Sequence, residues 1–218
     1  MIPLGDASRR TVRFPVVTLL IIAANVFVFG LELVGGDAFI YRWALVPANI
    51  TAGRALITLL TAMFLHEGWE HIIGNMIFFW AFGPEIEDTM GHSRFLIFYL
   101  LGGLAASAAQ ILVDPTSTIP NLGASGAIAA VMGAFLITYP HDRIRTVLII
   151  GWFVQIALIP SIFLVGFWFL TQLFSEVGAL IQVQSGGVAY MAHVGGFLFG
   201  VVLARLFESR RKDDILWD

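Results

Sequence analysis

The sequence contains no cysteine and very little charge. Of its 218 residues, 12% are charged and none is Cys, so disulfides, thiolate metal sites and cysteine nucleophiles are excluded. The formal net charge is −3, and no basic run occurs outside the ends of the chain, which leaves nothing for a nucleic acid to bind. A nucleic-acid partner is therefore not expected.

Apolar residues are what the chain has in abundance. They make up 58% of the sequence, and the mean hydropathy is +0.87, far outside the balance of a soluble domain. A hydrocarbon core of about 30 Å needs about 20 apolar residues per helix, so this length allows about six spans. We expect the lipid bilayer to surround the protein.

Six apolar segments, separated by short stretches rich in Pro, Gly or charge, predict six transmembrane helices. Most Lys and Arg residues fall on one side of these segments, which predicts cytoplasmic N- and C-termini. The fold class expected is all-α, a polytopic six-helix bundle that forms a single domain over residues 1–218. The approximate helices are residues 14–34, 70–84, 95–113, 125–139, 146–174 and 187–207. No transit peptide is evident, which favours a prokaryotic plasma membrane.

Three polar residues lie inside the predicted spans at matching depths, and a fourth lies one helical turn deeper. With a rise of about 1.5 Å per residue, Ser125, His193 and His71 lie about 22, 18 and 20 Å from the cytoplasmic ends of their helices. Asn75 follows His71 by one helical turn. In a core about 30 Å thick, this common level is submerged and nearer the outer face.

These residue types suit acyl transfer. Ser125 begins a short helix whose free N–H groups and positive dipole end favour an anion, such as a tetrahedral intermediate. A serine hydroxyl needs a base to become a nucleophile, and His193 is the candidate at the same depth. Side chains of His71 and Asn75 would complete an oxyanion hole.

Small residues predict that the fourth and sixth predicted helices pack closely. Gly126 and Gly133 lie on one, and Gly196 and Gly200 lie on the other. Small faces let two backbones approach each other. Such an approach would bring Ser125 within reach of His193.

Three motifs together resemble the rhomboid family of intramembrane proteases over nearly the whole chain. They are Gly123-Ala124-Ser125-Gly126, His66-x4-His71-x3-Asn75 and Ala192-His193-x-x-Gly196-x-x-x-Gly200. The resemblance implies a catalytic Ser125–His193 dyad without a carboxylate, an oxyanion site with His71 and Asn75, and structural support from His66 and Gly123. It also implies transmembrane protein substrates, no metal and no cofactor, a cap over the site at residues 175–186, and a fifth helix that gates lateral entry.

Two positions depart from the family pattern. Many members have an aromatic residue four positions after the serine to support the histidine ring, whereas this chain has Ala129. A Trp-Arg pair common in the first loop of the family is replaced by Tyr41-Arg42-Trp43. Because Ala129 has no aromatic ring, another group must orient His193.

Other interpretations of the same residues stay open. Ser125 could cap or pack its helix, Asn75 could join two helices by a hydrogen bond, and His66 could be interfacial and solvated. One alternative function is a metal or proton transporter that uses His66, His71 and His193, although the helix interiors lack carboxylates at that depth. Another is a catalytically silent relative that only binds transmembrane proteins.

Overall fold

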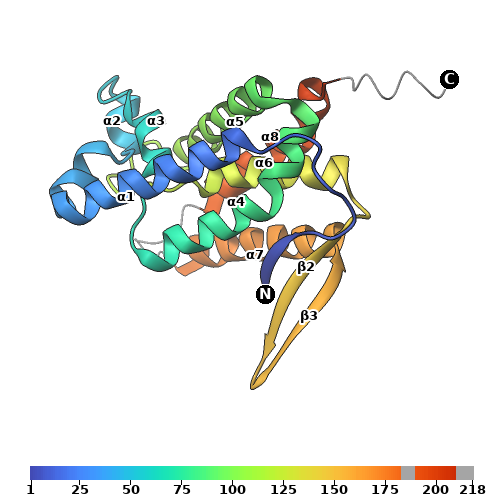
Figure 1. The fold of residues 1–218 in the computed structure, drawn as a ribbon. Coiled ribbons are helices and arrows are strands. Elements are labelled where there is room, and N and C mark those ends of the chain that lie inside the picture. The colour runs from blue at the N-terminus through green and yellow to red at the C-terminus, as the bar shows by residue number, and fades with distance from the viewer. Residues whose placement is uncertain (183–189, 210–218) are drawn as a thin grey trace.

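The computed structural model of the chain describes residues 1–182 and 190–209. Helices make up most of it, and a small sheet joins them at one end (Figure 1). The helices are α1 (Val16–Trp43), α2 (Pro47–Thr51), α3 (Thr58–Thr61), η1 (Ala62–Phe64), α4 (Trp69–Met90), α5 (His92–Val113), α6 (Ser125–Thr138), α7 (Ser161–Gln182) and α8 (Tyr190–Phe207). The strands are β1 (Ile2–Asp6), β2 (Arg143–Ile150) and β3 (Phe153–Pro160).

Helix α6 lies at the centre of the bundle. It contacts α4, α5, α7 and α8, and every residue from Gly126 to Phe135 is buried. A helix that is apolar all round must be enclosed on all sides, and the sequence of α6 carries no charged residue. Ser125 therefore stands at the end of the most enclosed helix.

The all-α prediction is wrong at one place, because a three-stranded antiparallel sheet of order β1-β2-β3 lies at one end of the bundle. Strands β2 and β3 pair from Arg143 opposite Pro160 to Ile150 opposite Phe153. A two-residue turn joins them, and Gly151 takes a φ of 59°, which suits the first central position of a type II′ turn.

The predicted fifth helix, residues 146–174, is accordingly wrong over its first half. Strands occupy that stretch as far as Pro160, and α7 begins at Ser161. The apolar run from Thr146 is rich in β-branched residues, and hydropathy alone does not separate a buried strand from a helix. At the other end, α7 continues to Gln182, so the predicted cap at residues 175–186 is helical over its first part, and the rest falls outside the described residues.

Each of the other predicted spans overlaps a helix with different bounds. Helix α1 continues past residue 34 to Trp43, with a break at Gly36, where φ is 60°. Helix α4 runs through Pro84 to Met90, and α5 begins at His92. The predicted sixth helix begins among residues outside the described ranges and is seen as α8 from Tyr190.

Within the described part of the chain, two helices, α1 and α5, are long and apolar enough to cross a membrane. Shorter apolar segments occur at Ser125–Thr138, Ser161–Phe174 and Met191–Phe207. Large apolar side chains are exposed along α1, α5 and α7, which is the surface expected of helices that face lipid. The crossing of the membrane by all six predicted spans stays a prediction.

The end of the bundle that carries the sheet, here called the sheet end, is rich in charge. Glu87 of α4 is fully buried and accepts hydrogen bonds from the backbone N–H groups of Val17 and Thr18, both at 2.8 Å. These N–H groups belong to the first turn of α1, where an acidic partner stabilises the helix start. Ser209, the last described residue, donates its N–H to the Thr89 carbonyl, so both ends of the described chain lie at the sheet end.

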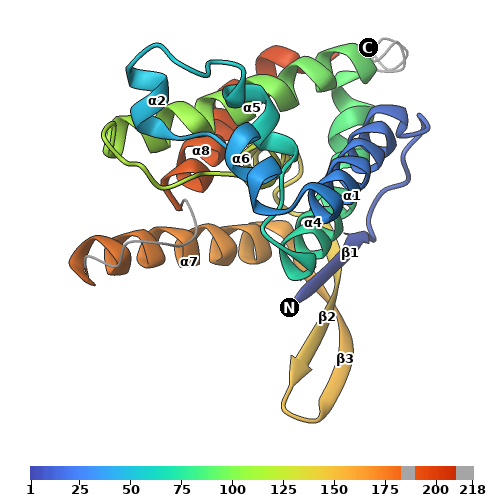
Figure 2. The same ribbon diagram turned by 90° about the vertical axis from the view of Figure 1, so that its left-hand side faces the viewer.

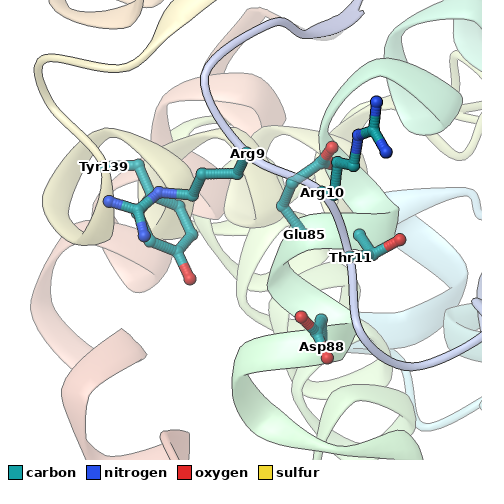
Figure 3. Close-up of a pocket in the computed structure, with 6 residues that line it drawn as sticks. All are labelled: Arg9, Arg10, Thr11, Glu85, Asp88 and Tyr139. Atoms are coloured by element: carbon teal, nitrogen blue, oxygen red, sulfur yellow. The ribbon is translucent and has the colours of Figure 1, made fainter.

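A cavity of about 160 Å³ lies between the N-terminal segment and α4 at the sheet end. Its lining residues include Glu85 and Asp88 of α4, and Figure 3 shows Arg9 reaching over Tyr139 while Arg10 points away on the other side of Glu85. The Arg9 guanidinium lies 4.3 Å from the centre of the Tyr139 ring and also pairs with Asp142. Burial raises the pKa of Asp6 nearby. The cavity thus lies at the opposite end of α6 from Ser125, since Tyr139 directly follows that helix.

Candidate active site

Ser125 is the first residue of α6, and the turn before it is built around glycine. Gly123 has a φ of 126°, a conformation that favours glycine, and its N–H donates to the Ala62 carbonyl at 2.9 Å. The first N–H groups of α6 have no partner within the helix, and no hydrogen bond from the side chain of the preceding residue caps them. The Ser125 hydroxyl therefore lies beside backbone donors suited to an anion.

The structure brings Ser125 and His193 together. The Nε2 atom of His193 lies 2.7 Å from the Ser125 Oγ, and the histidine is 7% exposed. The other ring nitrogen, Nδ1, lies 2.7 Å from the Gln172 Oε1 on α7. Because a carbonyl oxygen only accepts, Nδ1 carries the proton and Nε2 is left as the acceptor for the serine hydroxyl. This is the tautomer that a general base needs.

Gln172 and Trp168 surround the His193 ring from α7, one turn apart. The Trp168 ring centre lies 5.8 Å from that of His193. The sequence interpretation missed both residues, although a glutamine within an apolar helix was a usable signal. Ala129 is fully buried in the core, and the side-chain contacts that hold the His193 ring from α7 come from Gln172 and Trp168.

His71 reaches the site from α4. A Cβ placed on Gly123 would lie 2.9 Å from the Nε2 and Cε1 atoms of His71 and 3.5 Å from the Ser125 Oγ, so the ring lies directly against the turn. The Nδ1 atom of His71 accepts a hydrogen bond from the Glu67 N–H at 3.3 Å. In the neutral ring, Nε2 therefore carries the hydrogen and faces the turn before α6 as a donor.

Asn75 lies one turn after His71 on α4 and is buried. Its Nδ2 atom has no hydrogen-bond partner among the described residues. A buried amide hydrogen without a partner costs roughly 1–3 kcal/mol, so such a group calls for an explanation. A substrate oxygen or a water bound at the site would satisfy it.

His66 lies behind His71 and does not face water. It is 1% exposed, and its ring packs edge-on against that of His71 with centres 5.1 Å apart. Its backbone N–H donates to both oxygens of the buried Glu32 carboxylate on α1, at 3.1 and 3.2 Å. The interfacial, solvated interpretation of His66 is therefore wrong, and the side chain packs as part of the wall behind His71.

Helices α6 and α8 meet along a line of glycines, here called the α6–α8 seam, which comprises Gly126, Gly133, Gly196 and Gly200. A Cβ on Gly196 would lie 2.0 Å from the Gly126 carbonyl oxygen, and one on Gly133 would lie 2.3 Å from the Phe197 carbonyl oxygen. Only glycine allows backbones this close. The seam sets the distance between the two helices that carry Ser125 and His193.

Two further features bear on what the site can bind. The Gln110 Oε1 on α5 accepts the Ala192 N–H at 3.2 Å, which satisfies one donor in the first turn of α8. In the described ranges, no group of three or more His, Cys, Asp or Glu side chains is arranged to hold a metal ion. The chemistry that the site supports is hydroxyl activation by a neutral histidine.

The proteins of similar sequence are rhomboid proteins. The chain is 26% identical over 203 residues to Rhomboid protein 1, mitochondrial, of Saccharomyces cerevisiae, which covers 88% of the chain and 54% of the relative. It is 29% identical over 194 residues to Rhomboid protease GluP of Bacillus subtilis, covering 87% of the chain and 34% of the relative. It is 30% identical over 214 residues to RHOMBOID-like protein 12, mitochondrial, of Arabidopsis thaliana, covering 89% of the chain and 59% of the relative.

The chain thus spans about a third to three fifths of the length of these relatives. The family profile described as Rhomboid domain matches residues 53–210, a stretch that includes η1, the three-stranded sheet's hairpin and all helices from α4 to α8. Apart from Glu32 of α1, every residue placed at the site above falls within that match. The chain belongs to the rhomboid family of membrane-integral proteins.

Proposed function

We propose that this protein is an intramembrane serine endopeptidase that cleaves transmembrane or membrane-adjacent segments of other membrane proteins. The observation that carries the proposal is the 2.7 Å contact between the Ser125 Oγ and the His193 Nε2, in a ring whose Nδ1 is held by Gln172. Membership of a family with proteases among its members supports the same conclusion.

The proposed reaction begins when a substrate segment enters from the side and unwinds, so that one carbonyl carbon lies against Ser125. His193 takes the hydroxyl proton as the Oγ attacks, and the negative charge moves onto the carbonyl oxygen. The backbone N–H groups at the start of α6 and the side chains of His71 and Asn75 stabilise that oxygen. His193 then protonates the leaving amine, and the acyl group stays on Ser125.

Hydrolysis of the acyl group completes the cycle. A water molecule gives a proton to His193 as its oxygen attacks the acyl carbon, and His193 returns that proton to the Ser125 Oγ when the ester bond breaks. The Asn75 Nδ2, which has no partner within the described structure, is a donor available to such a water. No metal or cofactor takes part in this scheme, and the dyad uses no carboxylate.

The experiment is cleavage of a generic transmembrane substrate by the purified protein in detergent. We expect Ser125→Ala and His193→Ala to lose activity by about a thousandfold or more, since each removes a reacting group. Ser107→Ala, on α5, is the matched control and should cleave as the natural sequence does. Cleavage that persists in Ser125→Ala would sink the proposal.

Two alternative functions have different outcomes in the same preparation. A silent relative that only binds membrane proteins would retain a substrate without cleaving it, and Ser125 would not react with a fluorescent phosphonate that labels activated serines. A metal or proton transporter that uses His66, His71 and His193 would give a flux in proteoliposomes that survives Ser125→Ala. We expect labelling of Ser125 and no such flux.

We further propose a multi-pass protein with both termini in the cytoplasm, as the arginine distribution predicts. The location in a prokaryotic plasma membrane is a prediction that the relatives do not favour in particular, because two of the three named above are mitochondrial by name. Accessibility of single cysteines introduced near Asp6 and Asp37 would test the orientation in intact cells.

A further inference from the structure

The hairpin of β2 and β3 extends beyond the part of the sheet that other elements cover. Strand β1 pairs with β2 only as far as Val147, so the stretch here called the hairpin tip, residues 148–158, has no third strand beside it. Figures 1 and 2 show the hairpin leaving the bundle as a free two-stranded ribbon. A ribbon of this kind is only marginally stable in water.

The hairpin tip is apolar, and most of its described side chains are exposed. Gln155 is the only polar residue of the tip, and the tip contains no charged residue. Trp152 is 98% exposed and Phe153 is 79% exposed, and the other large side chains exposed on the tip are Ile149, Val154, Ile156 and Leu158. In water, such a surface on an uncovered strand pair would promote aggregation.

The root of the same hairpin has the opposite chemistry. Arg143 and Arg145 are exposed where β2 begins, and His141 precedes them. The ribbon therefore changes from cationic to apolar along its length, with a tryptophan at the far end. This order matches the surface of a bilayer, where phosphate groups give way to acyl chains and where Trp is enriched at the boundary.

The hairpin also adjoins the surface that the bundle turns toward lipid. Strand β3 leads directly into α7, whose exposed side chains include Ile162, Phe163 and Phe167. In Figure 1 the ribbon crosses the direction of α7 and leans toward the side into which α7 runs. If α7 enters the membrane from the sheet end, the ribbon lies along the membrane surface with its tip inclined into it.

We propose that the hairpin tip is an interfacial anchor that inserts into the headgroup and acyl boundary of the bilayer that holds the bundle. The occupant of its apolar surface is lipid of the leaflet at the sheet end, and Arg143 and Arg145 contact the lipid phosphates. The anchor fixes the start of α7 relative to the membrane. This assignment is independent of catalysis, because it depends only on where the ribbon points and what it exposes.

The absence of cysteine from the natural sequence allows a direct test. Trp152→Cys is made in a Ser125→Ala background, labelled with an environment-sensitive fluorophore, and reconstituted into vesicles that contain lipids with nitroxide quenchers at shallow or deep acyl positions. The matched control is Arg10→Cys, which places the same label at an exposed position of the sheet end outside the hairpin. A second variant, Ile149→Cys, repeats the test on the other strand.

We expect the labels at positions 152 and 149 to lose most of their emission to shallow acyl quenchers, less to deep ones, and the label at position 10 to be insensitive to both. Two results would overturn the assignment. One is emission at position 152 that acyl quenchers leave unchanged while a water-soluble quencher removes it. The other is energy transfer between labelled copies that grows with protein density, which would mean that a second copy covers the tip. Neither measurement uses a substrate, so the proteolytic proposal can fail without affecting the proposal that the hairpin tip is an interfacial anchor.

Discussion

The α6–α8 seam and helix α7 hold the same histidine ring from two sides, and they are packed very differently. At the seam, backbones touch so closely that a single methyl group at Gly196 would lie 2.0 Å from a carbonyl oxygen. On α7, a methyl group at Gly166 would meet nothing within 4 Å, and large side chains such as Phe163 and Phe167 are exposed. The seam is a contact between two backbones, whereas α7 meets α8 through side chains, such as Phe169, whose ring centre lies 4.3 Å from that of Phe197.

This difference separates two requirements of the proposed chemistry. The seam sets the distance from Ser125 to His193, whereas Gln172 on α7 sets which nitrogen of His193 carries the proton. A small displacement of α7 would break the Gln172 hydrogen bond and leave the serine contact intact. The seam therefore fixes the position of the Ser125 nucleophile, whereas activation of the His193 base depends on α7, which is held less tightly.

The largest effect is expected from filling the seam. Gly196→Ala places a Cβ against the Gly126 backbone, where no flexible side chain can yield, so the helices must separate. Overpacking of this kind costs about 1–3 kcal/mol, and the separation would also remove the Ser125 contact. We expect a lower midpoint of thermal unfolding in detergent and no measurable cleavage.

Gly166→Ala is the matched control on α7. It lies in open space within a helix, so the change should leave cleavage intact and stabilise the protein by up to about 1 kcal/mol. A lower unfolding midpoint for Gly196→Ala and a higher one for Gly166→Ala would sharpen the contrast between the seam and α7. Equal unfolding midpoints for Gly196→Ala and the natural sequence would break it.

The next effect concerns the α7 side of the ring. Gln172→Met keeps the volume of the side chain but removes the acceptor for His193 Nδ1, so the ring is free to adopt the unproductive tautomer. We expect kcat to fall by about 10- to 100-fold with little change in KM or in the unfolding midpoint, as befits weakened general-base catalysis. The measurement is steady-state cleavage in detergent.

Gln172→Glu restores an acceptor at the same position and serves as the rescue variant. It should recover most of kcat, and its pH profile should differ from that of the natural sequence because the new group titrates. A merely structural role for Gln172 predicts that Met, which packs well, is tolerated better than Glu. That order of activities would contradict the positioning role.

The sequence predicts those parts of the site that follow from regular helix geometry or from a repeated spacing of small residues. The equal depths of Ser125, His193 and His71 followed from the constant rise of a helix, and the glycine spacing indicated a close approach of two backbones. Gln172 lies inside the predicted fifth helix, but its contact with His193 on α8 does not follow from the composition of that helix. The hairpin was missed because apolar content predicts burial or lipid contact, not the backbone conformation.

Usable signals were nevertheless present in the missed region. Ile144, Thr146, Val147 and Ile149 are β-branched, and Gly151 follows them at the position of a turn. The role of α7 as a support for His193 could not follow from sequence in the same way, because it depends on how two helices distant in the chain are rotated. Such rotations are set by packing of the whole bundle.

A smaller effect is expected at the third side of the site, where α4 meets the turn before α6. Gly123→Ala puts a Cβ 2.9 Å from the His71 ring at a φ of 126°, so the ring must move and the turn is strained. We expect cleavage to fall by roughly 10-fold, since one oxyanion donor is displaced but the dyad survives.

The control for this site is Gly68→Ala, which lies just before α4 in extended backbone with open space around it. Its cleavage rate should match that of the natural sequence. Labelling of Ser125 by the phosphonate would separate the two effects, because a displaced His71 slows labelling less than a displaced His193 does. A Gly123→Ala variant with unchanged cleavage would mean that His71 takes no part in the site.

The smallest effect is expected at the sheet that leads into α7, where stability should depend on pH. Burial and the nearby Asp142 raise the pKa of Asp6, partly offset by the Ser8 N–H that it accepts. Between the unfolded value of about 3.8 and the raised value, the folded protein binds more protons than the unfolded chain. The free energy of unfolding therefore falls as pH rises through that interval, and the penalty persists at neutral pH.

Asp6→Asn removes this penalty and keeps an acceptor for the Ser8 N–H. We expect a gain in unfolding free energy on the order of 0.5 kcal/mol at about pH 7, reduced by solvent screening, and no gain near pH 3.5. Thermal unfolding in detergent over that pH range provides the measurement, with Asp37→Asn on the exposed part of α1 as the charge-matched control. A gain that is equal at both pH values, or shared by Asp37→Asn, would assign the effect to net charge and leave the sheet end no more sensitive to pH than the seam.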